Sequence, residues 1–382
     1  MHSTCGRYVI AFNGEIYNHL TLRKQLDELG AAPGWRGHAD TETLLACFAA
    51  WGVEKTLRAT VGMFAIALWD RQEKVLILAR DRMGEKPLYF GWQGRTLLFG
   101  SELKSLKAHP DFLAEVDRDA LTLLLRHNCV PAPFSIYKGI SKLMPGHFLR
   151  LALTNADEAR CARPQPYWRL NDAVEHGIQN PFLGSEAEAI ALLERQLSES
   201  IADQMLADVP LGAFLSGGVD SSTIVALMQA QSNRPVRTFT IGFDESGYDE
   251  ATHAKAVANH LGTEHTELYV RPEDALQVIP KLPAIYCEPF SDSSQIPTFL
   301  VSQLARQHVT VALSGDGGDE LFGGYNRYLS ARKVWGRMQR LPSGARHAAA
   351  RLLHTLSPAT WDRLFELAKS MLPRRFHLAT PG

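Results

Sequence analysis

The sequence predicts two domains of different fold class, an α+β domain over residues 1–150 and an α/β domain with a parallel sheet over residues 186–382. The first assignment rests on β-rich segments joined by short polar turns, which is typical of antiparallel hairpins. The second rests on short apolar runs that alternate with amphipathic segments, as in strands joined by helical crossovers. Residues 151–185 lose this periodicity and gather proline, asparagine and glycine. We expect a linker there, and a long loop of the first domain is the alternative.

Length and charge exclude several classes of protein. The chain has 382 residues, which suggests two or three domains, and its 40 Lys and Arg balance 41 Asp and Glu. This balance argues against a nucleic-acid-binding protein held by bulk charge, and 45% hydrophobic residues argue against disorder. The sequence shows neither a signal peptide nor an apolar stretch of about 18 residues. We therefore expect a cytoplasmic protein with neither a membrane nor a nucleic acid as partner.

The five cysteines do not form a metal or disulfide pattern. Their number is odd, and no two of them form a C-x-x-C pair. We expect reduced thiols rather than a zinc site or a disulfide framework.

In the first domain, strands are expected on both sides of short turns. Arg7–Asn13 is β-branched and aromatic and predicts a strand that ends at Gly14. Two hairpins are expected, one from residues 62–70 and 74–81, and one from residues 87–91 and 97–102. Helices are expected over residues 20–29 and 41–51, with Asp40 in a capping position before the second.

In the second domain strands and helices alternate. Ile190, Leu193, Leu197 and Ile201 recur at helical spacing and mark an amphipathic helix. Further elements follow in the order strand 209–215, helix from 222, strand 236–243, helix 250–261, strand 264–270 and strand 309–313. Such alternation predicts a parallel sheet whose ligand site lies at the carboxyl ends of the strands. Glycine turns follow the first and the last of these strands.

The first glycine turn has the composition of an anion-binding loop. It reads Ser216-Gly217-Gly218-Val219-Asp220-Ser221-Ser222, directly after a strand and at the start of a helix. Glycines allow close backbone approach, the helix N-terminus presents amide hydrogens, and the serine hydroxyls add donors. Asp220 repels phosphate unless Mg²⁺ lies between them, so the loop suits a metal-bound pyrophosphate. An ordinary helix-capping turn is the alternative interpretation.

This loop resembles the pyrophosphate loop (PP-loop) of the ATP pyrophosphatase superfamily, whose members adenylate a substrate and release pyrophosphate. The second turn, Ser314-Gly315-Asp316-Gly317-Gly318-Asp319-Glu320, is similar to the signature of glutamine-dependent asparagine synthetases and their relatives, such as the β-lactam synthetases. The resemblance implies ATP and Mg²⁺, with the metal held by Asp220 and Asp319. It also implies a catalytic role for Asp316, where many family members carry Glu. The ATP-binding residues that it implies are Phe214, Leu215, Ser216, Gly217, Gly218, Asp220, Ser221, Ser222, Ile241, Ser314 and Gly315.

A second match lies in the first domain. Phe12-Asn13-Gly14-Glu15-Ile16-Tyr17-Asn18 resembles the glutaminase motif of the same family, in a domain of the N-terminal-nucleophile (Ntn) hydrolase type. The residues suit the chemistry, because an amide side chain (Asn13) and a backbone N–H (Gly14) can form an oxyanion hole. The resemblance implies that Glu15 and Asp40 bind the α-amino group of glutamine. The segments 80–90 and 100–105 follow the family pattern too.

The resemblance covers only the middle of the family's architecture. The family nucleophile is a cysteine at position 2, whereas this chain begins Met1-His2, and we do not expect Cys5 to replace it. We therefore expect a glutaminase domain truncated at its N-terminus that does not hydrolyse glutamine. The family's C-terminal segment with a catalytic lysine has no counterpart, and we expect Lys333 and Lys369 to be surface residues. The second domain is thus expected to be truncated at its C-terminus.

The leading hypothesis is an asparagine synthase that adenylates aspartate with ATP, releases pyrophosphate, and amidates the product with ammonia from glutamine. A relative that acts on another carboxylate, in natural-product or polysaccharide synthesis, is the first alternative. A catalytically dead nucleotide-binding fragment is the second. The near-zero net charge disfavours a tRNA-modifying PP-loop enzyme. The expected partners are small molecules, and the resemblance implies a homodimer.

Overall fold

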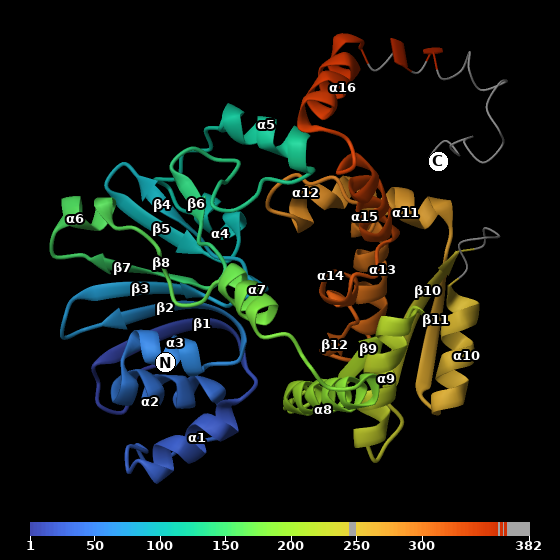
Figure 1. The fold of residues 1–382 in the computed structure, drawn as a ribbon. Coiled ribbons are helices and arrows are strands. Elements are labelled where there is room, and N and C mark those ends of the chain that lie inside the picture. The colour runs from blue at the N-terminus through green and yellow to red at the C-terminus, as the bar shows by residue number, and fades with distance from the viewer. Residues whose placement is uncertain (244–249, 358–359, 362, 365–382) are drawn as a thin grey trace. The chain divides into compact units, whose positions relative to one another are not determined.

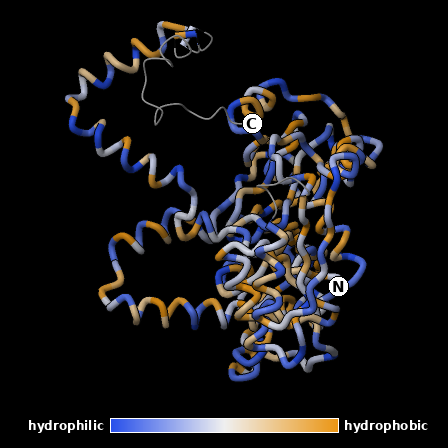
Figure 2. Tube along the Cα trace, turned by 90° about the vertical axis from the view of Figure 1, so that its right-hand side faces the viewer, coloured by the Kyte–Doolittle hydropathy of each residue, from blue (hydrophilic) through white to orange (hydrophobic). Residues whose placement is uncertain are grey.

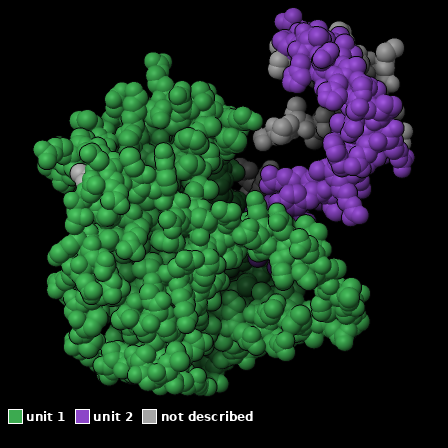
Figure 3. Space-filling model, turned by 60° about the vertical axis from the view of Figure 1, so that its left-hand side comes forward, with its two compact units in different colours: residues 1–315 green, residues 316–382 purple. Residues whose placement is uncertain are grey.

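A computed structural model describes residues 1–243, 250–357, 360–361 and 363–364 (Figure 1). The chain divides into two compact units, Met1–Gly315 and Asp316–Gly382, which Figure 3 shows in different colours. Figure 2 shows hydrophobic residues distributed along the chain trace in its densely packed part. The first unit contains an antiparallel region (residues 1–168) and a parallel region (residues 186–315), each with its own sheets and core.

The antiparallel region has two sheets. The first has the strand order β1-β2-β3-β7-β8, and the second has the order β5-β4-β6. The bounds of these strands are Tyr8–Ile16 (β1), Gly62–Asp70 (β2), Val75–Arg80 (β3), Tyr89–Gln93 (β4), Thr96–Gly100 (β5), Ile140–Lys142 (β6), His147–Ala152 (β7) and Gln165–Pro166 (β8). All pairings in the two sheets are antiparallel, as the sequence predicts for the two hairpins.

Helices cover the outer faces of these sheets, so that the region has four layers. The helices are His19–Glu28 (α1), Asp40–Trp51 (α2), Val53–Ala59 (α3), Leu103–Lys107 (α4), Arg118–His127 (α5) and Ala156–Cys161 (α6). One core joins α1, α2 and α3 to the first sheet, and a second core lies between the two sheets. A third core joins the second sheet to α4 and α5. Figure 1 shows α1–α3 together on one side of β1–β3.

The parallel region has one sheet of order β11-β10-β9-β12, and its pairings are parallel. Its strands are Leu211–Phe214 (β9), Arg237–Phe243 (β10), Glu264–Val270 (β11) and Val311–Leu313 (β12). Helices Leu170–Gln179 (α7) and Glu186–Gln204 (α8) precede the sheet. Its strands are connected by Val219–Gln231 (α9), Ala251–Leu261 (α10), Pro272–Val278 (α11), the 3₁₀ turn Ile279–Lys281 (η1), Leu282–Ile285 (α12) and Gln295–Ala305 (α13).

The helices of the parallel region cover both faces of its sheet. Apolar residues of α8, α9 and α10 pack on one face, and apolar residues of α13 pack on the other. This arrangement brings the carboxyl ends of β9 and β12 side by side, since Ala213 pairs with Leu313. The limits of the linker at 151 and 185 stay a prediction.

The second unit contains the helices Gly318–Phe322 (α14), Asn326–Met338 (α15) and Ser343–Thr355 (α16). Lys333 is exposed on α15. Lys369, the other expected surface lysine, lies outside the described residues.

Two local predictions are wrong. Gly14 does not end the first strand, because β1 continues through it to Ile16 and Gly14 pairs with Phe64. A Cβ at Gly14 would overlap the carbonyl oxygen of Met63, so the glycine permits close approach of β2 rather than a turn. Asp40 does not cap α2 either, because its carboxylate accepts a hydrogen bond from the backbone N–H of Ile16 at 2.9 Å instead.

Candidate functional site

The first candidate site is the turn that joins β9 to α9. Gly217 has a φ of 79°, which favours glycine, and a Cβ there would lie 2.6 Å from the backbone nitrogen of Ala254 on α10. The turn is therefore pressed against the start of a neighbouring helix. Gly218 then forms the N-cap of α9, a helix of 13 residues, and the first amides of an α-helix have no partner within the helix.

Three serine hydroxyls shape this turn. Ser216 Oγ and Ser221 Oγ are 2.9 Å apart, and Ser216 Oγ accepts a hydrogen bond from the N–H of Gly218 at 3.2 Å. Ser222 Oγ differs, because it is buried and has no hydrogen-bond partner among the described residues. A buried hydroxyl without a partner is costly, so this atom favours a ligand oxygen at the turn.

The second glycine turn lies directly beside the first. Ser314 and Gly315 follow β12, and a Cβ at Gly315 would lie 2.7 Å from the backbone nitrogen of Ser221. Only a glycine allows the two backbones this separation. The two motifs that sequence analysis placed 93 residues apart (Ser221 and Ser314) therefore meet at the carboxyl ends of adjacent parallel strands, where ligands of α/β sheets bind.

The acidic part of the second turn belongs to the second unit. Asp316 is exposed, and Asp319 lies in the first turn of α14. A Cβ at Gly324 would overlap the Asp319 carboxylate, so this glycine leaves room for the acidic side chain. Tyr325 donates a hydrogen bond to Glu320 at 2.7 Å, which lowers the pKa of the Glu320 carboxyl. No group of three or more His, Cys, Asp or Glu side chains suited to a metal occurs in the described part of the chain.

The three expected adenine-lining residues lie on two neighbouring strands or directly after them. Phe214 ends β9 and is half-buried against one core, whereas Leu215 is 1% exposed and packs in the core on the opposite face. Ile241 is half-buried in β10, and its partner across the sheet is Leu268 of β11. Contact of these side chains with a nucleotide stays a prediction.

In the antiparallel region, Asn13 and Gly14 lie on the edge strand β1. Amide groups alternate along a strand, and those of Ile10 and Ile16 bond to Met1 and Asp40, on the side away from β2. The N–H of Gly14, in the same alternation, points to this open side too. The Asn13 side chain is exposed and donates a hydrogen bond to Ser101 Oγ at 2.9 Å. Its amide is thus held by the segment after β5.

The Glu15 and Asp40 carboxylates interact electrostatically. Burial and then the charge of Asp40 raise the pKa of the Glu15 carboxyl. Such a pair favours a cation between its members, because an ammonium group offsets their repulsion. The amino group of an amino acid suits this place.

The segment after β3 has a structural role. The Arg80 guanidinium donates to the carbonyl oxygens of Gly84, Lys86 and Leu143 at 2.6–2.8 Å. The buried Asp81 carboxylate accepts backbone hydrogen bonds from Phe64, Glu85 and Lys86. These contacts fix a long loop to both sheets, and the residue types in this segment do not distinguish such a role from a binding role.

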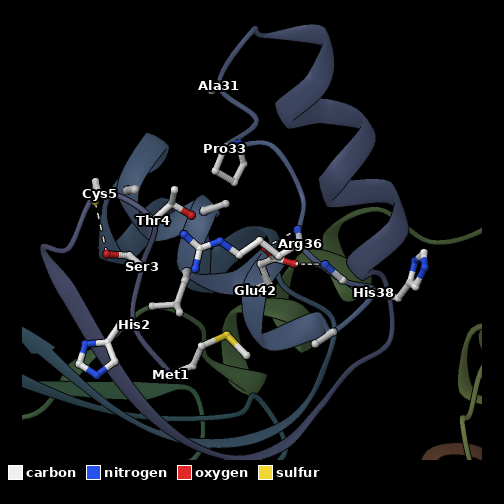
Figure 4. A pocket seen from close by; sticks show the side chains of 15 residues that line it. Met1, His2, Ser3, Thr4, Cys5, Ala31, Pro33, Arg36, His38 and Glu42 are labelled. Carbon is white, nitrogen blue, oxygen red and sulfur yellow. Dashed lines mark hydrogen bonds between the residues drawn. The ribbon is translucent and has the colours of Figure 1, made fainter.

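Cys5 lies at the other end of β1 from Asn13. Ser3 exchanges two hydrogen bonds with Tyr8, and Cys5 lies in the turn between them. The strand from Tyr8 to Asn13 spans about 17 Å at 3.4 Å per residue. Cys5 instead borders a cavity of about 630 Å³ together with Arg36 and Glu42, shown in Figure 4. That Cys5 is not the nucleophile of a site at Asn13 stays a prediction.

Two further expectations concern cysteines and membranes. The structure describes all five cysteines as free thiols. In the part of the chain that the structure describes, no helix combines the length and the apolar character needed to cross a membrane.

Comparisons with known proteins identify both regions. The family model described as "Glutamine amidotransferase domain" matches residues 1–168, and the one described as "Asparagine synthase" matches residues 192–379. A putative glutamine-hydrolysing asparagine synthetase of Methanocaldococcus jannaschii is 36% identical over 85% of this chain and 60% of its own length. Asparagine synthetase 1 of Bacillus subtilis is 34% identical over 90% of this chain and 52% of its own length. The chain thus spans between half and two thirds of the length of these relatives.

One relative carries a different name. A Penicillium rubens protein named as an amidase is 30% identical over 83% of this chain and 47% of its own length. Similarity to this chain therefore extends to a protein that is not named as a synthetase.

Proposed function

The chain belongs to the family of glutamine-hydrolysing asparagine synthetases, and from this we propose that its parallel region activates a carboxylate with ATP for amidation. The substrate is aspartate by default. The observation that carries the proposal is the meeting of the two glycine turns, with Gly315 against the backbone of Ser221.

Different residues of these turns bind different parts of ATP. The amides that open α9 and the hydroxyls of Ser216, Ser221 and Ser222 hold the β- and γ-phosphates, and the unpartnered Ser222 Oγ fits this role. Ser314 and Gly315 approach the nucleotide from β12, while Phe214 and Ile241 border the adenine. The Leu215 side chain packs on the opposite face of the sheet. Asp220 and Asp319 would hold a Mg²⁺ ion, which neutralises the charge on the departing pyrophosphate.

The reaction has two steps. A carboxylate oxygen of the acceptor attacks the α-phosphorus of ATP, and the bond from that phosphorus to the β-phosphate bridging oxygen breaks to release pyrophosphate. Ammonia then attacks the acyl carbon, and the bond to the AMP oxygen breaks to give the amide. Asp316, in the signature turn, takes up the proton that nitrogen loses.

The antiparallel region is proposed to bind glutamine. The Asn13 amide and the Gly14 N–H form the oxyanion hole, and the Glu15–Asp40 pair binds the α-amino group. Hydrolysis also needs a thiolate, and Cys5 lies too far along β1 to provide it.

The test is release of pyrophosphate from MgATP by the full chain. Stimulation by aspartate, with asparagine formed when ammonium is supplied, is the expected result. Pyrophosphate release that no carboxylate stimulates would overturn the assignment of a synthetase. Binding of MgATP without turnover would leave only a nucleotide-binding role.

A second candidate is an amidotransferase that acts on a different carboxylate. It rests on the two turns, which are proposed to bind ATP rather than the acceptor, and on a relative that is not named as a synthetase. Stimulation by another carboxylate and not by aspartate would select this candidate. A homodimer and a cytoplasmic location complete the proposal, and light scattering of the purified chain tests the former.

A further inference from the structure

Residues 285–291 connect two regions of the first unit. They begin at the last residue of α12 in the parallel region, yet several of their partners belong to the antiparallel region. Leu103 donates its N–H to Cys287 Sγ at 3.2 Å, and Ser291 donates its N–H to the carbonyl oxygen of Asn128 at 2.7 Å. Lys104 Nζ also lies 3.4 Å from the carbonyl oxygen of Ile285. We call residues 285–291 the connecting segment.

Glu288 is the centre of this connection. Its side chain is 8% exposed, and it forms an ion pair with Lys142 of β6, whose side chain is 15% exposed. Its Oε1 accepts the N–H of Ile136 at 2.7 Å, and its Oε2 lies 3.4 Å from the hydroxyl of Tyr89. Lys142 donates a second hydrogen bond to the carbonyl oxygen of Val130. The antiparallel region thus supplies each of these partners of the buried carboxylate.

A buried carboxylate is costly unless such partners surround it. The partners of Glu288 meet it only when the connecting segment lies against β4 and β6. Separation of the two regions would leave both Glu288 and Lys142 without their shared contacts. The energetics therefore favour a connecting segment that stays in place.

This connection extends to both candidate sites. Leu103, which binds Cys287, lies two residues after Ser101, which binds the Asn13 side chain. On the other side, α13 follows the connecting segment and packs against β10, the neighbour of β9. A continuous set of contacts thus runs from Asn13 through residues 101–103 and the connecting segment to the sheet that carries the phosphate turn.

We propose that Glu288 is a positioning residue that couples the two regions, so that a nucleotide bound after β9 stabilises residues 101–107 beside Asn13. The choice of nucleotide as probe rests on the proposed function. The coupling itself is a property of the contacts of Glu288 and can be measured without a ligand.

The ligand-free test is hydrogen–deuterium exchange of the full chain, read by peptide. In Glu288→Ala, amide exchange in residues 101–107 is expected to become at least tenfold faster, while exchange in the β2–β3 hairpin stays unchanged. Glu288→Gln retains an acceptor for Ile136 but loses the ion pair, so its effect is expected to be intermediate. Glu264→Gln is the matched control, because Glu264 pairs with Arg237 at an exposed site. Should Glu288→Ala not fold, Cys287→Ala replaces it, since it removes the acceptor of Leu103.

The second measurement adds MgATP. In the unchanged chain, MgATP is expected to slow exchange in residues 216–222 and in residues 101–107, and in Glu288→Ala only in residues 216–222. Equal protection of residues 101–107 in both proteins, or unchanged ligand-free exchange in a folded Glu288→Ala, would overturn the coupling. Failure of MgATP to protect residues 216–222 would overturn the proposed function instead, and the ligand-free test would still decide the role of Glu288.

Discussion

Gly315 lies so close to Ser221 that a Cβ at position 315 would be 2.7 Å from the Ser221 backbone nitrogen and 2.9 Å from the carbonyl carbon of Asp220. Backbone atoms cannot move aside as a flexible side chain can. A side chain at this position must therefore separate the two glycine turns, and nucleotide affinity should depend on their separation.

We predict that Gly315→Ala raises the dissociation constant of MgATP at least tenfold. The cost of the forced shift is about 1–3 kcal/mol, as for overpacking in a well-packed interior. Calorimetric titration of the purified chain gives the affinity. Gly336→Ala is the control, because a Cβ there meets nothing within 4 Å on α15, and it should leave the affinity unchanged. Equal affinities for both variants would show that the turns do not share a ligand.

Removal of the Ser222 hydroxyl is predicted to affect the stability of the ligand-free chain and the affinity for MgATP differently. Removal of its buried, unpartnered hydroxyl should leave the ligand-free chain as stable as before or slightly more stable. Loss of a donor to phosphate should nevertheless weaken MgATP about tenfold, or about 1.4 kcal/mol. Thermal unfolding of Ser222→Ala with and without MgATP measures both effects.

The control for Ser222 is the next residue on α9. The Thr223 hydroxyl donates to the carbonyl oxygen of Val219 within the same helix, so Thr223→Ala should not change nucleotide affinity. If Ser222→Ala lowers the stability of the ligand-free chain and binds MgATP normally, its hydroxyl is structural.

The two glycine turns could be predicted from the sequence because their signals are local. Each turn combines glycines, serines and acidic residues directly after an apolar strand, and strand alternation places both at one edge of a sheet. The structural roles of Gly14 and Asp40 were predicted incorrectly because their signals are not local. Their structural roles depend on Met63 and Ile16, which are distant in sequence, and a short motif does not contain that information.

Glu288 was missed for the same reason. In the sequence it is one acidic residue before Pro289, in a segment without periodicity. Its partners Tyr89, Ile136 and Lys142 precede it by more than 140 residues. Only the folded chain shows that these residues enclose one carboxylate.

Gly324 gives a prediction for the second unit. A Cβ at this position would overlap the Asp319 carboxylate, so Gly324→Ala should displace the proposed metal-binding side chain. Pyrophosphate release should fall at least tenfold and recover in part at higher Mg²⁺ concentration, since a weakened metal site is filled by mass action. Gly344→Ala, with open space around its Cβ, should retain activity. A loss of activity that Mg²⁺ does not change would place the defect elsewhere than at Asp319.

The last prediction concerns the pH dependence of stability in the antiparallel region. The Arg7 guanidinium donates to both oxygens of Asp70 at 2.7–3.1 Å, at the start of β1 and the end of β2. Burial alone would raise the pKa of Asp70, but the Arg7 hydrogen bonds and the N–H groups of Glu73 and Gln72 outweigh it and lower the pKa below 3.8. The ionised carboxylate therefore stabilises the folded chain at neutral pH.

Asp70→Asn should lower the free energy of unfolding by about 1–2 kcal/mol at pH 7. This value already allows for solvent screening at the partly exposed Arg7 side chain. The pKa of Asp70 is lower in the folded chain than in the unfolded chain. The difference in free energy of unfolding between Asp70→Asn and the unchanged chain is therefore largest above pH 3.8, and it decreases as the pH falls through the pKa of the folded state. Urea unfolding followed over this pH range measures it. Glu54→Gln is the control, since its pair with Arg58 is equally short at 2.8 Å but exposed on both sides, and its effect should stay below about 0.5 kcal/mol at every pH. A difference for Asp70→Asn that grows on acidification would contradict the lowered pKa of Asp70.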